Sequence, residues 1–98
     1  MLQDIYNQLN QINLVKTQYE FSEKWLGRSK SYFSVLKRNG NEPSAAVLFT
    51  LRSRIIAQTR RLEFDRSRSN LAGSYFDPVV TLQETRSMIE TLILNKFV

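Results

Sequence analysis

The chain of 98 residues has no cysteine and no histidine. A disulfide framework is therefore impossible, and the thiolate and imidazole sites that usually hold zinc or haem are excluded. Ser-His and Cys-His catalytic pairs are excluded because one member is missing. No apolar run approaches the roughly 18 residues of a membrane span, and the polar N-terminus with Asp4 is unlike a secretory signal. We expect a cytoplasmic binding protein with no enzymatic activity, no metal, no cofactor and no membrane contact.

Glycine and proline are also scarce, with three Gly and two Pro, and each lies between stretches of periodic apolar residues. This placement is typical of breaks between helices. The apolar spacing of three and four predicts helices over residues 2–15, 17–26, 30–38, 43 to about 62, and 79 to the C-terminus. Sustained alternation with a period of two is absent, so strands are not favoured. The sequence therefore predicts an all-α fold of about five helices.

Positive charge is concentrated in the middle of the chain. The whole chain carries a net charge of +5. Residues 14–70 hold twelve Lys and Arg against five Asp and Glu, a net +7, whereas each end carries −1. A basic segment of this kind favours a polyanionic partner, with double-stranded DNA first among the candidates. A solvated basic surface without a partner is the alternative explanation of the same charges.

Residues 17–40 combine two short helices with a glycine between them. Thr17 and Glu20 have the spacing of a capping box, and Gly27 can take the positive φ angle that ends a helix. Ser29 is then a candidate N-cap of the next helix, which Gly40 ends. Its inward residues are Phe33 and Leu36.

This segment, TQYEFSEKWLGRSKSYFSVLKRNG, resembles the helix-turn-helix of phage repressor and Cro-type DNA-binding proteins. In that family a Thr/Ser-Gln pair opens the first helix, a large and a small residue follow, and a glycine marks the turn. The resemblance extends through the helix that starts at Pro43 and Ser44. One feature departs from the family pattern: Trp25 and Leu26 stand where the family usually has one apolar residue. Which of the two is buried stays open.

The second helix of this motif has a free polar side without acidic residues, and such a side can enter the major groove of DNA. The amides at its start, near Ser29, favour a phosphate. The resemblance implies a backbone contact for the Gln that opens the first helix. The predicted DNA-binding residues are Gln18, Arg28, Ser29, Lys30, Ser31, Tyr32, Ser34, Lys37 and Arg38.

The last predicted helix has a broad apolar side. We expect residues 1–70 to form the DNA-binding domain, and the amphipathic helix within residues 71–98 either to complete its core or to pair with a second copy. Helix-turn-helix regulators usually bind as two-fold dimers, so a homodimer is expected. The predicted interface residues are Leu82, Ile89, Leu92, Ile93 and Phe97.

These patterns predict a small sequence-specific transcription regulator of bacterial or phage type that associates with the nucleoid. No ligand domain is evident, so no small-molecule ligand is indicated. The alternative is a helical protein-interaction module, such as an anti-activator or a phage-type inhibitor, because a helix-turn-helix scaffold can serve without DNA.

Overall fold

The computed structural model describes the backbone of residues 2–69 and 78–97, and side chains up to residue 64 and from residue 78. Within these ranges the chain is all-α and has no strand, as predicted. The elements are α1 (Leu2–Gln11), α2 (Gln18–Glu20), the π-helical segment η1 (Phe21–Trp25), α3 (Tyr32–Arg38), α4 (Ala45–Ser69) and α5 (Pro78–Lys96). The predicted domain boundary at residues 70 and 71 lies outside the described residues.

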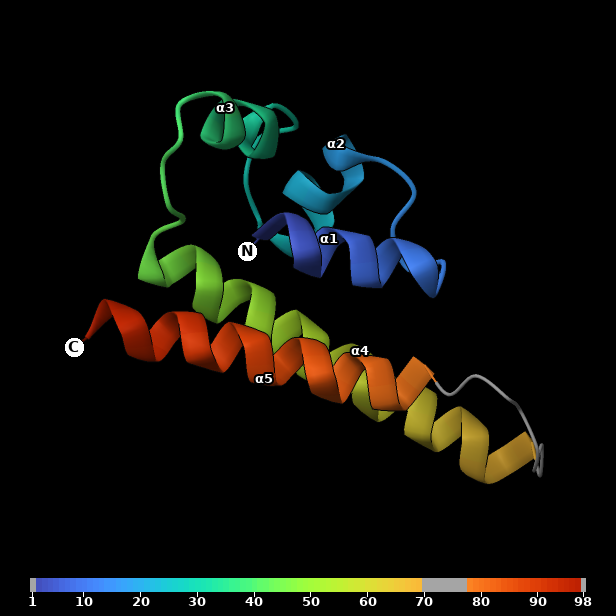
Figure 1. Ribbon diagram of the computed structural model, residues 1–98. Helices are drawn as coiled ribbons and strands as arrows, with labels where there is room; N and C mark the ends of the chain where they lie inside the picture. Colours follow the sequence, from blue (N-terminus) through green and yellow to red (C-terminus); the bar gives the residue numbers. More distant parts are fainter. Residues whose placement is uncertain (1, 70–77, 98) are drawn as a thin grey trace.

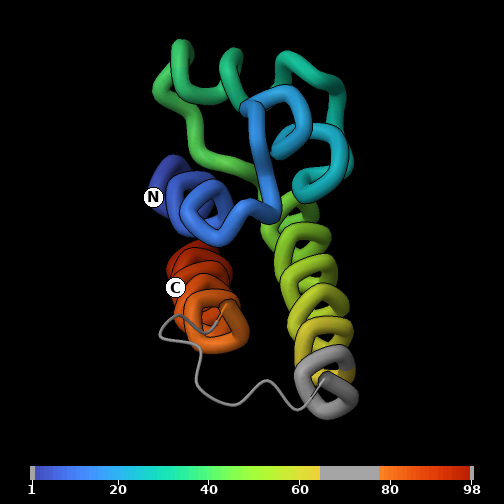
Figure 2. Tube along the Cα trace, turned by 90° about the vertical axis from the view of Figure 1, so that its right-hand side faces the viewer, coloured from blue at the N-terminus to red at the C-terminus, as the bar shows by residue number. Residues whose placement is uncertain are grey.

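The two long helices, α4 and α5, run side by side along the length of the molecule (Figure 1). Helix α4 begins where Pro43 and Ser44 predict a start, because the Ser44 hydroxyl oxygen accepts a hydrogen bond from the Val47 amide at 3.3 Å. Helix α1 runs along one side of this pair, beside α5 (Figures 1 and 2). Helix α3 lies near the start of α4, and α2 lies further along the molecule, above α1 (Figure 1).

The core forms where α1, η1 and α3 meet the two long helices. It is almost entirely aliphatic and aromatic, as the apolar spacing predicts. Its most deeply buried side chains are Ile5, Leu9, Val15, Phe21, Leu26, Phe33, Val47, Leu48, Leu51, Ile55, Leu82 and Ile89.

Helix α5 closes this core. The single hydroxyl proton of its buried Thr85 is shared between the Gln8 side-chain oxygen of α1 and the Thr81 carbonyl, so the polar group does not remain unpaired. Leu82, Ile89 and Ile93 are buried within the chain, and Leu92 is half-buried.

The expected dimer interface is therefore wrong in its main members. The side chains of Leu82, Ile89 and Ile93 cannot face a second copy because this chain itself covers them. Of the five expected interface residues, Phe97 is the one that is largely exposed, at 70%.

A charged cluster joins α4 to α5. Arg52 and Arg86 each direct their Nε at the same Glu90 carboxylate oxygen, at 3.1 and 3.0 Å. Both hydrogen bonds lower the pKa of Glu90, and the one from Arg52 has the larger effect. Since all three side chains are substantially exposed, the cluster contributes little to the stability of the fold.

Candidate nucleic-acid interface

The first helix of the 17–40 segment consists of α2 and η1. It contains one residue more than a regular α-helix with the same number of turns. Thr17 caps it as predicted, with its hydroxyl accepting from the Glu20 amide at 3.1 Å. From Phe21 onward the helix is π-helical, and the Leu26 amide bonds to the Phe21 carbonyl five residues back. A π-bulge widens a helix by one residue. Both Trp25 (7% exposed) and Leu26 (1%) are therefore buried, which answers the question that the sequence leaves open.

Gly27 forms the turn, as predicted, with a φ of 68°. A Cβ atom there would lie 3.3 Å from the Thr50 methyl of α4, so both the backbone and the packing favour glycine.

The Arg54 guanidinium of α4 donates to the carbonyls of Glu23 and Lys24, which lie in the last turn of η1. Arg54 thus holds the end of a helix and is not a free phosphate contact.

An aromatic cluster fixes α3 against the rest of the protein. The Phe33 ring is fully buried, with its centroid 5.0 Å from that of Phe21 and 5.8 Å from that of Tyr6. The Phe21 and Phe33 rings meet edge to face, a favoured geometry for aromatic pairs.

The start of α3 differs from the prediction. The helix begins at Tyr32, and residues 30 and 31 form a turn in which the Tyr32 amide bonds to the Ser29 carbonyl. The predicted N-cap, Ser29, therefore precedes the helix by more than one residue. The buried Ser22 hydroxyl of η1 instead accepts from the Phe33 amide at 3.0 Å. An amide of the first turn is thus satisfied by a side chain of the preceding helix.

The end of α3 agrees with the prediction. Gly40 has a φ of 65°, its amide bonds to the Lys37 carbonyl, and the Asn41 amide bonds to the Leu36 carbonyl. This is a Schellman motif, which stops a helix and satisfies its last carbonyls.

The side of α3 that points away from Phe33 and Leu36 carries short polar groups and one arginine. Ser31, Val35 and Arg38 are exposed and Ser34 is half-buried. At three or four residues apart, these four positions share one side of the helix. Val35 is absent from the predicted site, although its spacing from Phe33 and Leu36 already directs it outward. An exposed valine on such a side can contact a thymine methyl group.

Three predicted DNA contacts, Gln18, Ser34 and Lys37, are engaged within the chain. Lys37 donates to the Gln3 side chain of α1 at 3.1 Å, and its Nζ lies 4.6 Å from the centre of the Phe33 ring. Gln18 accepts a hydrogen bond from the Ser34 hydroxyl at 3.3 Å. Gln18 therefore lies beside α3, where it joins the first helix of the segment to the second.

The turn that leads into α3 is the most exposed part of the predicted site. Arg28, Ser29 and Lys30 all lie open to solvent. The Arg28 guanidinium carbon is 5.8 Å from the centre of the half-buried Tyr32 ring, a loose cation–π contact. Between residues 24 and 41 there are five Lys and Arg and no Asp or Glu. The turn and the outer side of α3 therefore carry no acidic side chain of their own.

The described residues show no group of three His, Cys, Asp or Glu side chains that could hold a metal ion. Among the same residues, no helix has the length and apolar character needed to cross a bilayer.

The chain matches the model of a family of unknown function, DUF6626, over residues 2–96. The chain belongs to the DUF6626 family. The match includes all the described helices, so α5 is as much a part of the DUF6626 unit as the segment around Gly27. No curated protein matches the chain. No solved structure matches it either.

Proposed function

We propose that this DUF6626 protein is a sequence-specific DNA-binding regulator of helix-turn-helix type, which acts in the cytoplasm on nucleoid DNA. The observation that carries the proposal is the exposed surface of Arg28, Lys30, Ser31, Val35 and Arg38, which is free of acidic residues. The buried Phe33 supports a rigid α3 behind this surface.

In the proposed complex the outer side of α3 enters the major groove. Arg38 donates to guanine O6 and N7 or to a phosphate, the Ser31 and Ser34 hydroxyls contact base edges, and Val35 contacts a thymine methyl. Arg28 and Lys30, in the turn before α3, bind backbone phosphates and set the register of the protein on the duplex. Lys37 stays with α1 and positions α3. The protein regulates transcription by occupying its site.

The first test is the salt dependence of DNA binding. We expect the protein to retain specific fragments in a gel shift against genomic DNA with competitor present. If each chain neutralises three or four phosphates, log K should fall against log salt with a slope of about −2.7 to −3.6 for each chain bound. A protein that retains no fragment at low salt contradicts the proposal.

A homodimer belongs to the same proposal, with a different interface from the one the sequence predicts. Leu94 and Phe97 are 65% and 70% exposed at the end of α5, and Phe49 is 45% exposed on α4. On α4, Phe49 lies three residues before Arg52. On α5, Leu94 lies four residues after Glu90, which is the ion-pair partner of Arg52. Both apolar side chains therefore lie next to the charged cluster. Together they offer an apolar patch for the same patch of a second copy.

We expect light scattering at micromolar concentration to give twice the mass of the 11.5 kDa chain. Replacing Leu94 and Phe97 by serine should shift the mass toward one chain, whereas Val80→Ser, at an exposed position in the first turn of α5, should not. A single-chain mass for the unmodified protein overturns the dimer.

A further inference from the structure

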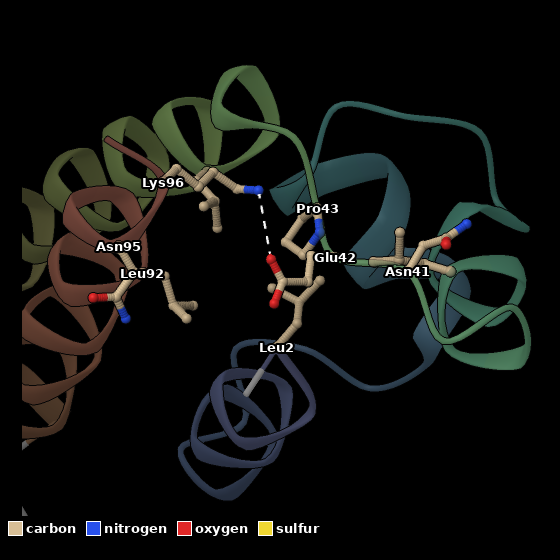
Figure 3. Close-up of a pocket in the computed structure, with 9 residues that line it drawn as sticks. Leu2, Asn41, Glu42, Pro43, Leu92, Asn95 and Lys96 are labelled. Carbon is tan, nitrogen blue, oxygen red and sulfur yellow. Dashed lines mark ion pairs between the residues drawn. The ribbon is translucent and has the colours of Figure 1, made fainter. Parts of the chain in front are cut away.

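A cavity of about 540 Å³ lies where three parts of the fold meet: the first turn of α1, the segment between α3 and α4, and the last turn of α5 (Figure 3). Its walls are Leu2, Leu36, Asn41, Glu42, Pro43, Leu48, Leu92, Asn95 and Lys96. Its volume falls within the range of about 300–1,000 Å³ that is usual for small-molecule sites.

The walls divide into an apolar part and a polar part. Four leucines and a proline supply apolar surface, and Asn41 and Asn95 supply side-chain amides. The charged members are Glu42 and Lys96, which face each other across the opening (Figure 3). Polar and apolar surface thus contribute about equally to the lining, and a mixed lining suits a ligand that has both a charged and an apolar part.

The ion pair at the opening is loose. Lys96 Nζ and Glu42 Oε2 are 4.0 Å apart, and the Glu42 side chain is 88% exposed, whereas that of Lys96 is 24% exposed. A pair with one exposed member contributes little to stability, so Glu42 can turn into water at small cost. The less exposed lysine can then take a closer carboxylate from a ligand, which forms a shorter charge-assisted hydrogen bond.

We propose that this cavity binds a small amphipathic carboxylic acid. The apolar body of the ligand packs against the half-buried Leu36 and Leu92, and its carboxylate replaces that of Glu42 at Lys96. The site is independent of DNA binding, and it differs from the sequence-based expectation that no small-molecule ligand is involved.

The test uses decanoate as the probe, titrated calorimetrically into the full chain, with decanol as its uncharged counterpart. We expect saturable binding of one decanoate per chain and at least tenfold weaker binding of decanol. Lys96→Met, which keeps the length of the side chain but removes its charge, should weaken decanoate binding about tenfold. Glu42→Gln should strengthen it, because the internal competitor for Lys96 is removed.

Matched controls separate this site from general attraction of an anion to a basic protein. Lys16→Met and Glu84→Gln change the same charges at exposed positions outside the cavity wall and should leave the affinity unchanged. Amide chemical shifts should move at Leu36, Asn41 and Leu92 and not at the exposed Leu94. Equal binding of decanol, or equal effects of the Lys96 and Lys16 variants, overturns the proposal.

Discussion

Replacing Phe33 by alanine is expected to lower the free energy of unfolding by about 3–5 kcal/mol. The Phe33 ring is fully buried and contacts the Phe21 and Tyr6 rings, so its removal leaves a cavity and ends both aromatic contacts. A small domain has a total stability of about 5–15 kcal/mol. The loss should therefore lower the melting temperature by at least about 12 °C, measured by circular dichroism.

The matched control is Phe97→Ala, which removes the same atoms at a position that is 70% exposed. In the single chain it should change the free energy of unfolding by about 0.5 kcal/mol or less. The control is measured at submicromolar concentration, where the proposed dimer through Phe97 contributes least. Equal destabilisation by the two variants would show that Phe33 does not hold α3 to the core.

The second large effect is expected from reversing charge beside α3. The double variant Lys30→Glu with Arg38→Glu should weaken DNA binding by roughly 10²-fold or more at low salt, because loss of a single Arg or Lys contact costs about 1–3 kcal/mol. Both side chains are exposed, so the fold should tolerate the change, and an unaltered melting temperature would verify this. Fluorescence anisotropy with a retained genomic fragment measures the effect.

Net charge alone also affects binding to DNA, so the control must change it equally. Lys16→Glu with Arg60→Glu reverses two exposed cations in the loop after α1 and on α4, away from α3. We expect this variant to lose affinity severalfold at most. If both double variants lose affinity equally, binding depends on overall charge, and the assignment of α3 as the DNA-contacting helix is wrong. If neither loses affinity, a protein-interaction module on the same scaffold becomes the better explanation.

The features that the sequence predicts correctly depend on local chemistry. Thr17 and Ser44 cap helices, and Gly27 and Gly40 end them, since each effect involves residues a few positions apart. The spacing of Phe33 and Leu36 likewise shows which side of α3 turns inward. Periodicity and turn chemistry are sufficient for such features.

The features that the sequence does not predict depend on partners far along the chain. Residue 33 receives its capping hydroxyl from Ser22, and Lys37 reaches Gln3, which is 34 positions away. A wide apolar side on the last helix can pack into the core of its own chain, and it can equally pack against a second copy. The choice between the two depends on α1 and α4, which here cover Leu82 and Ile89.

The π-helical segment has a consequence for comparing members of the DUF6626 family. The extra residue is absorbed inside η1, upstream of Gly27, so the turn keeps its place against α4, and α3 keeps its place against η1. A relative that lacks either Trp25 or Leu26 should have a regular α-helix there and the same surface around Arg38. In an alignment, the difference would appear as a single-residue gap within a helix, where gaps are ordinarily avoided. An alignment that moves this gap into the turn would misplace every proposed DNA contact by one position.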